Sequence, residues 1–433
     1  MPKKEKRQLK WVRLDNAAKI YPAARRKYWS NLFRQSITLV EDVDVDVLKS
    51  ALAVTVKRFP TIAARLRKGA FWFYLQQLDS PPEIREEQSY PLVYMNNREM
   101  RKCAFRVIVY RNRIAVEFFH SLTDGTGGLI FLKTLTAEYL EQKYGISIPC
   151  EDGVLDRRDP PSEAELEDSF LKYSGPVAVG RKATTAWHLS GDRETDKHFL
   201  NITCFSVSSR ELLDMSHKYG ATMTVFLGAV MMKALLNLQA EKVADIRRRK
   251  PIKLLIPVNL RQLFPSNTLR NFAMFTIPEI EPRLGDYTIE EICKIIQSKM
   301  TAEITTKHMS GVIAKNVADE RNLLLRIVPL PLKNIVMKAV FDSVGERKSC
   351  LTMSNLGLVR MPDAMKEYVK RVDFILGVQA EAPYNCGVAS FGDTVYVNFI
   401  RNVRDAELER HFFAVLRDMG VTVTVESNQN EEV

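Results

Sequence analysis

Residues 119–128 read Phe-His-Ser-Leu-Thr-Asp-Gly-Thr-Gly-Gly, and this stretch determines how the rest of the chain is interpreted. A β-rich run comes before it and a helical pattern follows it, so the stretch is expected to turn from a strand into a helix. Its glycines allow a tight turn and a close approach of a ligand to the backbone. His120 is therefore predicted at the end of a strand and at the mouth of a cleft, with Asp124 in the turn.

The segments on either side of the turn have clear secondary-structure patterns. Ala104–Tyr110 and Ile114–Phe119 are rich in β-branched and aromatic residues, which predicts a hairpin that ends at His120. Leu129–Tyr144 has apolar residues at helical spacing, and Gly145 is placed to end that helix.

His120 is the candidate for proton transfer. A neutral imidazole has a pKa of about 6.5, so it can accept a proton near neutral pH and return it later. The remaining histidines lack a comparable sequence context, and we expect them to have no catalytic role: His188, His198, His217, His308 and His411.

Asp124 has two possible roles. It could orient His120, or it could brace the loop, because a buried carboxylate needs a cation. Arg261 is the attractive partner, since it follows the apolar run Ile252–Val258 that predicts a buried strand. The sequence thus predicts an ion pair between Asp124 and Arg261 that ties two halves of the chain together.

The whole chain predicts an α/β fold with mixed sheets and flanking helices. Residues 151–197 hold a charged, proline-containing run without a sustained apolar period, which is typical of a crossover or linker. The expected units are a disordered basic tail at 1–13, an N-terminal α/β subdomain at 14–150, this crossover, a C-terminal α/β subdomain at 198–425 and an acidic tail at 426–433. Further elements are expected as a helix ended by Pro60, strands at Leu200–Val207, Cys350–Met353, Gly387–Ser390 and Thr394–Phe399, and helices at Ser209–Tyr219, Thr222–Leu236 and Ala406–Met419.

Composition narrows the function classes. The 433 residues carry a formal net charge of +11, but 52 acidic residues accompany the 63 basic ones, so we expect no nucleic-acid partner. Six scattered cysteines without a CxxC pair predict neither a metal site nor a disulfide framework. The longest apolar run, Val225–Met232, is too short to span a membrane. We expect a cytoplasmic monomer.

The segment His120-Ser-Leu-Thr-Asp124-Gly125 resembles the HxxxDG signature of CoA-dependent acyltransferases related to chloramphenicol acetyltransferase, a superfamily that includes condensation domains. Three further segments resemble that family in the same order along the chain. They are Pro257-Val-Asn-Leu-Arg261, Arg270-Asn271-Phe272, and Ser354-Asn355-Leu356-Gly357 with Pro362 downstream. The resemblance extends from about Leu14 to Met419. It implies two chloramphenicol acetyltransferase-like subdomains with the active site in a tunnel between them.

Departures from the family pattern indicate a branch. Condensation domains usually carry a second histidine where this chain has Phe119, and the DFGWG motif of plant acyltransferases is matched only loosely at 373–377. The alcohol acetyltransferase-like branch is the most similar one.

The resemblance also implies roles for individual residues. His120 would act as the general base, and Asp124 as a structural brace for Arg261. The oxyanion of the tetrahedral intermediate would be stabilised by the Gly125 N–H and by the Ser354 or Asn355 side chain. The basic run Arg247, Arg248, Arg249 and Lys250 could meet the phosphates of coenzyme A.

The function that follows is transfer of an acyl group from an acyl-CoA co-substrate to a small hydroxyl or amine acceptor, with no permanently bound cofactor and no metal. A second reading has the acyl group delivered by an acyl carrier protein, for acyl transfer or condensation. A third, of a different class, is a non-catalytic binding or scaffold module of the same fold. The retention of His120, Asp124 and Arg261 together argues against this third reading.

Overall fold

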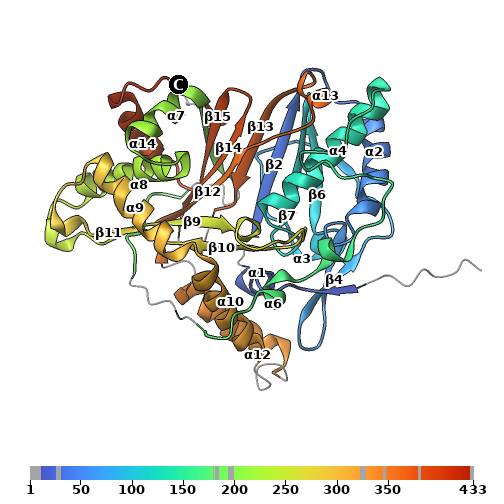
Figure 1. Cartoon of the computed structure of the whole chain (residues 1–433), viewed down its shortest axis with the longest axis horizontal. Helices are drawn as coiled ribbons and strands as arrows, with labels where there is room; N and C mark the ends of the chain where they lie inside the picture. The colour runs from blue at the N-terminus through green and yellow to red at the C-terminus, as the bar shows by residue number, and fades with distance from the viewer. Residues whose placement is uncertain are drawn as a thin grey trace, which may run out of the picture.

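The computed structural model describes residues 11–25, 31–178, 180, 185–193, 199–321, 328–344, 348–378 and 382–429. Two large sheets dominate these residues, and helices cover their outer faces (Figure 1). The expected tails at 1–10 and 430–433, and His198, lie outside the described residues.

The first large sheet carries His120 at the end of one of its strands. It has five strands in the order β13-β2-β7-β6-β5, and β6 and β7 form the predicted hairpin. The strands are β2 (Leu32–Leu39), β5 (Ile84–Glu86), β6 (Phe105–Tyr110), β7 (Arg113–Phe119) and β13 (Val369–Leu376).

Helices α2 (Val45–Arg58) and α4 (Gly125–Tyr144) belong to the same half and pack against each other. Asp44 caps α2 by accepting from two backbone N–H groups, as its position in the sequence suggests. Gly145 ends α4 in the left-handed conformation with φ of 66°, which costs glycine little. The α4 helix begins four residues earlier than the apolar pattern predicts, because Asp124 supplies its N-cap.

The second large sheet forms the other half. Its strands follow the order β10-β9-β12-β14-β15-β8-β16, with β11 also paired to β9. They are β8 (Asn201–Ser208), β9 (Ile252–Asn259), β10 (Ala273–Thr276), β11 (Glu279–Ile280), β12 (Leu351–Leu358), β14 (Tyr384–Phe391), β15 (Thr394–Arg401) and β16 (Val423–Ser427). The β12 strand runs parallel to both of its neighbours, so the sheet is mixed, as expected.

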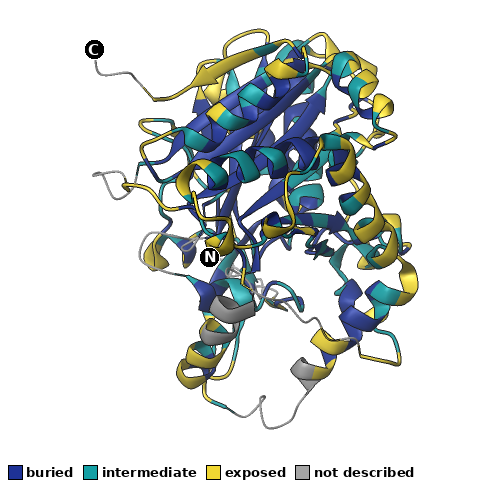
Figure 2. Cartoon of the chain, turned by 90° about the vertical axis from the view of Figure 1, so that its left-hand side faces the viewer, coloured by how far each residue is buried: buried dark blue, intermediate teal, exposed yellow. Residues whose placement is uncertain are grey.

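The core of this half lies between the sheet and its helices (Figure 2). These helices are α7 (Ser209–Lys218), α8 (Met223–Lys242), α9 (Ile289–Glu303) and α14 (Glu407–Asp418). Among the described residues, α8 alone is long and apolar enough to cross a membrane, but 72% of that window is buried inside the protein. Its apolar surface is used by the core.

One strand crosses between the halves. The β13 strand lies in the C-terminal part of the sequence, yet it pairs with β2 along Leu376↔Phe33 to Val369↔Leu39. The two sheets are therefore not separated by a single cut at 151–197, contrary to the expected subdomain at 198–425. The physical reason is that β2 would otherwise be an exposed edge strand, and β13 satisfies its backbone groups.

Both expected tails begin or end inside regular structure. Trp11–Arg13 forms β1 and pairs with β4 (Phe73–Gln77), which also pairs with β3 (Ala64–Lys68) in a small third sheet. Glu426 lies in β16 and forms an ion pair with Arg371 at 2.6 Å. The tails proposed at 1–13 and 426–433 are too long for this reason.

The crossover contains two short helices, α5 (Glu163–Leu166) and α6 (Ser169–Lys172). Arg58 holds it to α2 through two hydrogen bonds to Glu165, of 2.5 and 2.7 Å. Other helices not predicted from the sequence are α9, α1 (Ile20–Ala24), α3 (Asn97–Met100), α10 (Thr306–Arg321), α12 (Leu330–Val344), α13 (Asp363–Lys366), and the 3-10 turns η1 (Ile246–Arg248), η2 (Leu260–Gln262) and η3 (Pro282–Leu284).

Candidate active site

His120 lies where β7 ends, as the sequence predicts. Its backbone N–H donates to the carbonyl of Asn31 at 2.9 Å, which continues the strand pairing by one residue. The imidazole stacks on the Tyr21 ring at 4.5 Å and meets the edge of Phe33 at 5.0 Å. The residue is partly buried, so the ring is held firmly while part of it stays accessible.

A hydrogen bond joins His120 to the other half of the molecule. Nδ1 lies 3.1 Å from Oδ1 of Asn271, in the segment that leads into β10. The Asn271 amide Nδ2 in turn donates to the Asp15 carboxylate at 3.3 Å. The histidine therefore sits at the seam between the two sheets, with Nε2 left free of these partners.

Burial lowers the pKa of His120, because removal from water disfavours the charged imidazolium. The negative charges of Asp124 and Asp15 and the hydrogen bond to Asn271 partly offset this effect. The ring is thus poised to be neutral, and able to accept a proton, at near-neutral pH.

Asp124 braces the turn and makes no contact with His120 that would orient it. Its Oδ1 accepts from the Gly127 N–H at 3.1 Å, and its Oδ2 accepts from the Phe272 N–H and from Arg261 Nη1, both at 2.8 Å. Within the described part of the chain, no hydrogen bond connects Asp124 to His120. The predicted pair with Arg261 is present, and the triad-like alternative is not.

Arg261 uses its remaining donors to shape the loop that carries Asn271. Nε and Nη2 donate to the Thr268 carbonyl at 3.0 and 2.8 Å, and Nη2 also donates to the Arg270 carbonyl at 2.7 Å. Nearby, Asn259 Nδ2 donates to Thr126 Oγ1 at 3.1 Å. The ion pair thereby fixes the turn after His120 and the loop opposite it in one network.

Gly125 begins α4, so its N–H has no acceptor within the helix and lies at the positive end of the helix dipole. The strand β12 packs against this point, since a Cβ on Gly125 would approach Leu356 Cδ2 to 2.9 Å. An N–H so placed can stabilise a developing negative charge.

The two other oxyanion candidates differ in orientation. Ser354 pairs with Gly387, whose absent side chain would point at the Phe374 carbonyl, and residues paired across strands share a face. Ser354 therefore faces β13, on the side of the sheet toward the N-terminal half. Asn355 faces α8, where Nδ2 donates to Thr224 Oγ1 at 3.0 Å and Oδ1 accepts from the Gly357 N–H at 2.8 Å. Its amide is engaged in holding the end of β12.

The basic run at 247–250 is not brought to this site. It lies around η1, before β9, whereas Asn259 beside the His120 turn ends β9. A strand rises about 3.3 Å per residue, so the run is separated from the turn by roughly 23 Å of β9. This separation does not test the binding of coenzyme A phosphates by these four residues, which stays a prediction.

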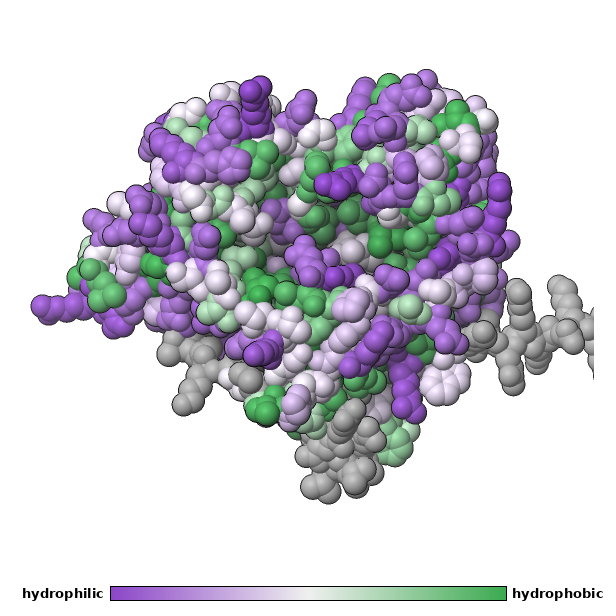
Figure 3. Space-filling view, in the orientation of Figure 1, coloured by the Kyte–Doolittle hydropathy of each residue, from purple (hydrophilic) through white to green (hydrophobic). Residues whose placement is uncertain are grey.

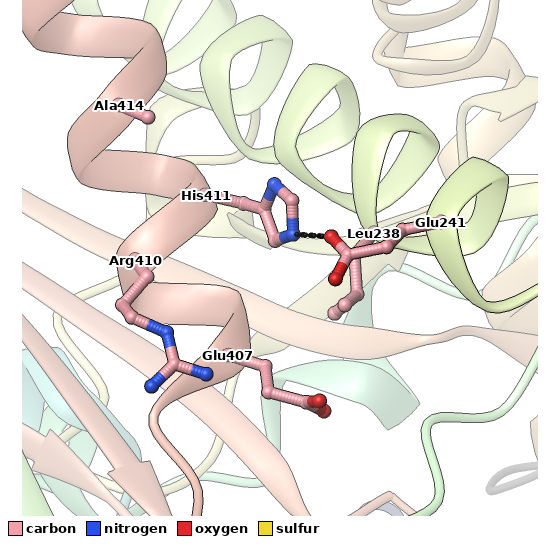
Figure 4. A pocket seen from close by; sticks show the side chains of 6 residues that line it. All are labelled: Leu238, Glu241, Glu407, Arg410, His411 and Ala414. Carbon is pink, nitrogen blue, oxygen red and sulfur yellow. Dashed lines mark hydrogen bonds and ion pairs between the residues drawn. The ribbon is translucent and has the colours of Figure 1, made fainter.

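The surface is depressed between the two halves (Figure 3). Apolar side chains gather in the depressed middle of the face in Figure 3, flanked by hydrophilic rims. Two surface hollows of about 290 and 710 Å³ lie elsewhere and contain no residue of the His120 site. The smaller lies between α8 and α14, where His411 Nε2 is 3.0 Å from Glu241 Oε2 (Figure 4). The described residues contain no cluster of His, Cys, Asp and Glu suited to a metal ion.

Comparison with known proteins gives distant likenesses. No family model matches the chain. The uncharacterized protein Rv2305 of Mycobacterium tuberculosis strain H37Rv is 23% identical over 405 residues, which cover 88% of this chain and 92% of that protein. Its counterpart MT2362 in strain CDC 1551 matches equally well.

Solved structures show the fold more clearly. Polyketide synthase associated protein 5 from Mycobacterium tuberculosis superposes with a TM-score of 0.55 at 13% identity, covering 94% of this chain and 96% of that one. F. graminearum TRI101 in complex with coenzyme A and deoxynivalenol gives 0.60 at 11% identity, covering 92% and 96%. The first condensation domain of the CDA synthetase gives 0.56 at 12% identity, covering 94% and 95%. The two-subdomain chloramphenicol acetyltransferase-like fold is therefore confirmed.

Sequence reasoning missed part of the site. Asn271 was noted only as a member of a matching segment, and nothing in the sequence drew attention to Asp15 or Tyr21. The latter two lie about a hundred residues before His120, in a segment with no catalytic pattern, so only the fold could bring them to the ring.

Proposed function

We propose that this chain transfers an acyl group from a thioester to a hydroxyl or amine acceptor, with Nε2 of His120 as the general base. The observation that carries the proposal is the hydrogen bond between His120 Nδ1 and Asn271 Oδ1. It leaves Nε2 free, on a partly accessible ring, at the seam where two sheets of an acyltransferase-type fold meet.

The reaction follows from the positions of these groups. Nε2 of His120 takes the proton of the acceptor O–H or N–H, and the freed lone pair attacks the thioester carbonyl carbon. The resulting oxyanion would be stabilised by the Gly125 N–H and the Ser354 hydroxyl, and one such donor contributes roughly 3–4 kcal/mol. The carbon–sulfur bond then breaks, and the thiolate takes the proton back from His120. No acyl-enzyme forms.

An acyl-CoA is the proposed donor. TRI101 from F. graminearum and from F. sporotrichioides, which has the same fold, has been solved with coenzyme A bound. A carrier-protein thioester is the second candidate, supported by the likeness to a condensation domain of the CDA synthetase. Both donors release the same kind of thiol, so His120 would act identically on them.

The apolar middle of the depression between the halves favours an acceptor with a substantial apolar part, because burial of apolar surface stabilises binding. The alcohol acetyltransferase-like branch, a cytoplasmic location and a monomeric state remain part of this proposal.

The test measures thiol release from a panel of acyl-CoAs with alcohol and amine acceptors, and from an acylated carrier protein. Wild type is compared with His120→Ala and with His217→Ala, which removes an exposed histidine from α7. We expect release that His120→Ala reduces by roughly 10²–10⁴-fold and His217→Ala leaves unchanged. Equal rates for His120→Ala and wild type would overturn the role of His120. Release from the carrier protein alone would establish the second donor, and no release from any donor would favour a non-catalytic module.

A further inference from the structure

His120 is the last member of a hydrogen-bonded series that begins at Asp15. We propose that Asp15 and Asn271 are positioning residues: Asp15 orients the amide of Asn271, and Asn271 holds Nδ1–H of His120 so that the lone pair lies on Nε2. The effect of these residues on catalysis rests on the proposed function, whereas the two hydrogen bonds do not depend on whether the protein turns over a substrate.

Asp15 is buried, and among the described residues each of its hydrogen-bond and ion-pair partners is a donor. Its Oδ1 accepts from the Ala18 N–H at 2.7 Å, and its Oδ2 lies 3.4 Å from the Asn271 N–H and 3.7 Å from Arg270 Nε. Only 1% of Asp15 is exposed, so water does not compete for these positions. Burial raises the pKa of Asp15, whereas the charge of Arg270 and the N–H donors of Ala18 and Asn271 act against this rise by stabilising the carboxylate form, which accepts from every neighbour.

The acceptor role of Asp15 determines which ring nitrogen of His120 carries the proton. Because the Asp15 oxygen accepts, the Asn271 atom facing it at 3.3 Å must be the donor Nδ2. The other end of the same amide, Oδ1, then faces His120 and can only accept. The ring nitrogen opposite it, Nδ1, must carry the proton, which leaves Nε2 as the base.

A second acceptor agrees with this assignment. The backbone carbonyl of His120 itself also accepts from the ring. That carbonyl belongs to the same residue, whereas Asn271 reaches across from the loop before β10. Asn271 is therefore the contact that fixes the ring relative to the other half of the molecule.

The segment carrying Asp15 is attached to the turn it serves. Ser121 Oγ donates to the Ala18 carbonyl at 3.0 Å, and Tyr21 covers one face of the imidazole. The Asp124 carboxylate, by contrast, is fully used by Gly127, Phe272 and Arg261. Asp15 and Asn271 therefore orient the His120 ring, and Asp124 stabilises the turn.

Two variants test the series. Asp15→Asn keeps the volume but allows a donor to face Asn271, so the Asn271 amide can reverse and present Nδ2 to the ring. Asn271→Leu keeps the approximate volume and removes both hydrogen bonds. Matched controls are Asp373→Asn and Asn385→Leu, because both residues are buried and hydrogen-bonded away from His120.

The first readout is the ¹⁵N spectrum of the histidine rings at a pH where His120 is neutral, with His120→Ala used to assign its signals. We expect wild type to hold the proton on Nδ1, and both variants to shift population toward the Nε2–H tautomer, while the two controls do not. An unchanged tautomer in Asp15→Asn and Asn271→Leu would overturn the proposal. Asp15→Asn removes no volume and carries this test even where Asn271→Leu does not fold.

The second readout is steady-state thiol release. We expect kcat to fall roughly 10- to 100-fold in both variants with KM nearly unchanged, within the roughly 10²–10⁴-fold that a general base supplies. A loss confined to KM, or the same loss in the controls, would contradict a positioning role. If wild type shows the expected tautomer but no donor is turned over, the proposed function fails and the positioning series survives. If wild type turns over a donor while its His120 ring holds the proton on Nε2, the positioning series fails and the proposed acyl transfer survives.

Discussion

At the scale of single residues, the site divides its tasks among groups that look alike in the sequence. His120, which we propose as the base, is partly accessible and is linked through Asn271 to the buried carboxylate of Asp15, whereas the other described histidines lack such a hydrogen-bond series. Asp124 is only four residues after His120, yet its carboxylate binds Arg261, because the residue caps the N-terminus of α4 and its side chain is directed to that end of the helix. The hypothesis of an orienting Asp124 is replaced by an orienting Asn271.

The pKa of His120 sets the pH range of the reaction. The base must be neutral, so activity appears as the pH rises through its pKa. Burial lowers that pKa, and the negative charges of Asp124 and Asp15 only partly offset the effect. The Tyr21 ring covers one face of the imidazole. We expect the acid limb of kcat/KM to lie below the ordinary histidine value of about 6.5. Thiol-release rates across pH measure it, with His411→Ala as a control that leaves the limb in place; a limb above that value would contradict the burial argument.

Arg261 is predicted to be essential for stability. In Arg261→Ala the nearly buried Asp124 loses its cation and the loop at 268–270 loses three hydrogen bonds. We expect the free energy of unfolding to fall by about 3–5 kcal/mol. Urea denaturation measures it, and Arg248→Ala, on the exposed η1 turn, should change it by less than about 0.5 kcal/mol. An Arg261→Ala protein as stable as wild type would disprove the bracing role.

At the scale of elements, the start of α4 is built for close packing. Gly127 has no room for a side chain, because a Cβ there would lie 2.2 Å from Thr123 Oγ1 and 2.4 Å from the Leu269 carbonyl. Gly125 is less confined, since its nearest neighbour would be the end of the flexible Leu356 side chain at 2.9 Å. The glycines of the turn thus bring the loop of the other half into contact with the helix start.

Gly127→Ala is therefore expected to be strongly destabilising. The Leu269 carbonyl is backbone and cannot move without disturbing the loop that presents Asn271, so we expect a loss of at least about 2 kcal/mol. Gly228→Ala in the middle of α8 is the control. Its Cβ would meet neighbours at 3.3–3.6 Å, and we expect a change within about 1 kcal/mol. Thermal or urea unfolding compares the two, and equal stability of both variants would refute the close-contact argument.

At the scale of the whole molecule, the halves are linked because the C-terminal part of the sequence supplies a strand to the N-terminal sheet. The β13 strand completes the N-terminal sheet while its neighbour in sequence, β14, lies in the C-terminal sheet. Gly387 allows β14 to pass β13, because a Cβ there would lie 2.2 Å from the Phe374 carbonyl. The site that we propose at this seam depends on both sheets at once.

The link through β13 predicts cooperative unfolding. We expect variants that retain only Trp72, in the N-terminal half, or only Trp187, in the C-terminal core, to show the same urea midpoint by fluorescence. The reason is that loss of either sheet releases β13 and opens the other. Two separate midpoints would show that the halves unfold independently, and the protein with all its tryptophans serves as the reference.

The sequence alone determined the local structure around the site. The hairpin, the glycine that ends α4 and the pairing of Asp124 with Arg261 follow from residue pattern, turn chemistry and the need of a buried charge for a partner. The fold class followed from the ordered matches to a known signature. The position of β13 in the N-terminal sheet and the helices α9, α10 and α12 had no comparable local signal.

Tertiary structure decided which nitrogen of His120 faces Asn271, and hence which nitrogen we propose as the base. That choice depends on Asp15, Asn271 and the ring, whose segments are separated by more than a hundred residues and meet only when the sheets close on each other. A hydrogen bond has a direction that local pattern does not encode, because it is fixed by the donors and acceptors that the fold places around it. The sequence identified the histidine, and the fold determined how it is oriented.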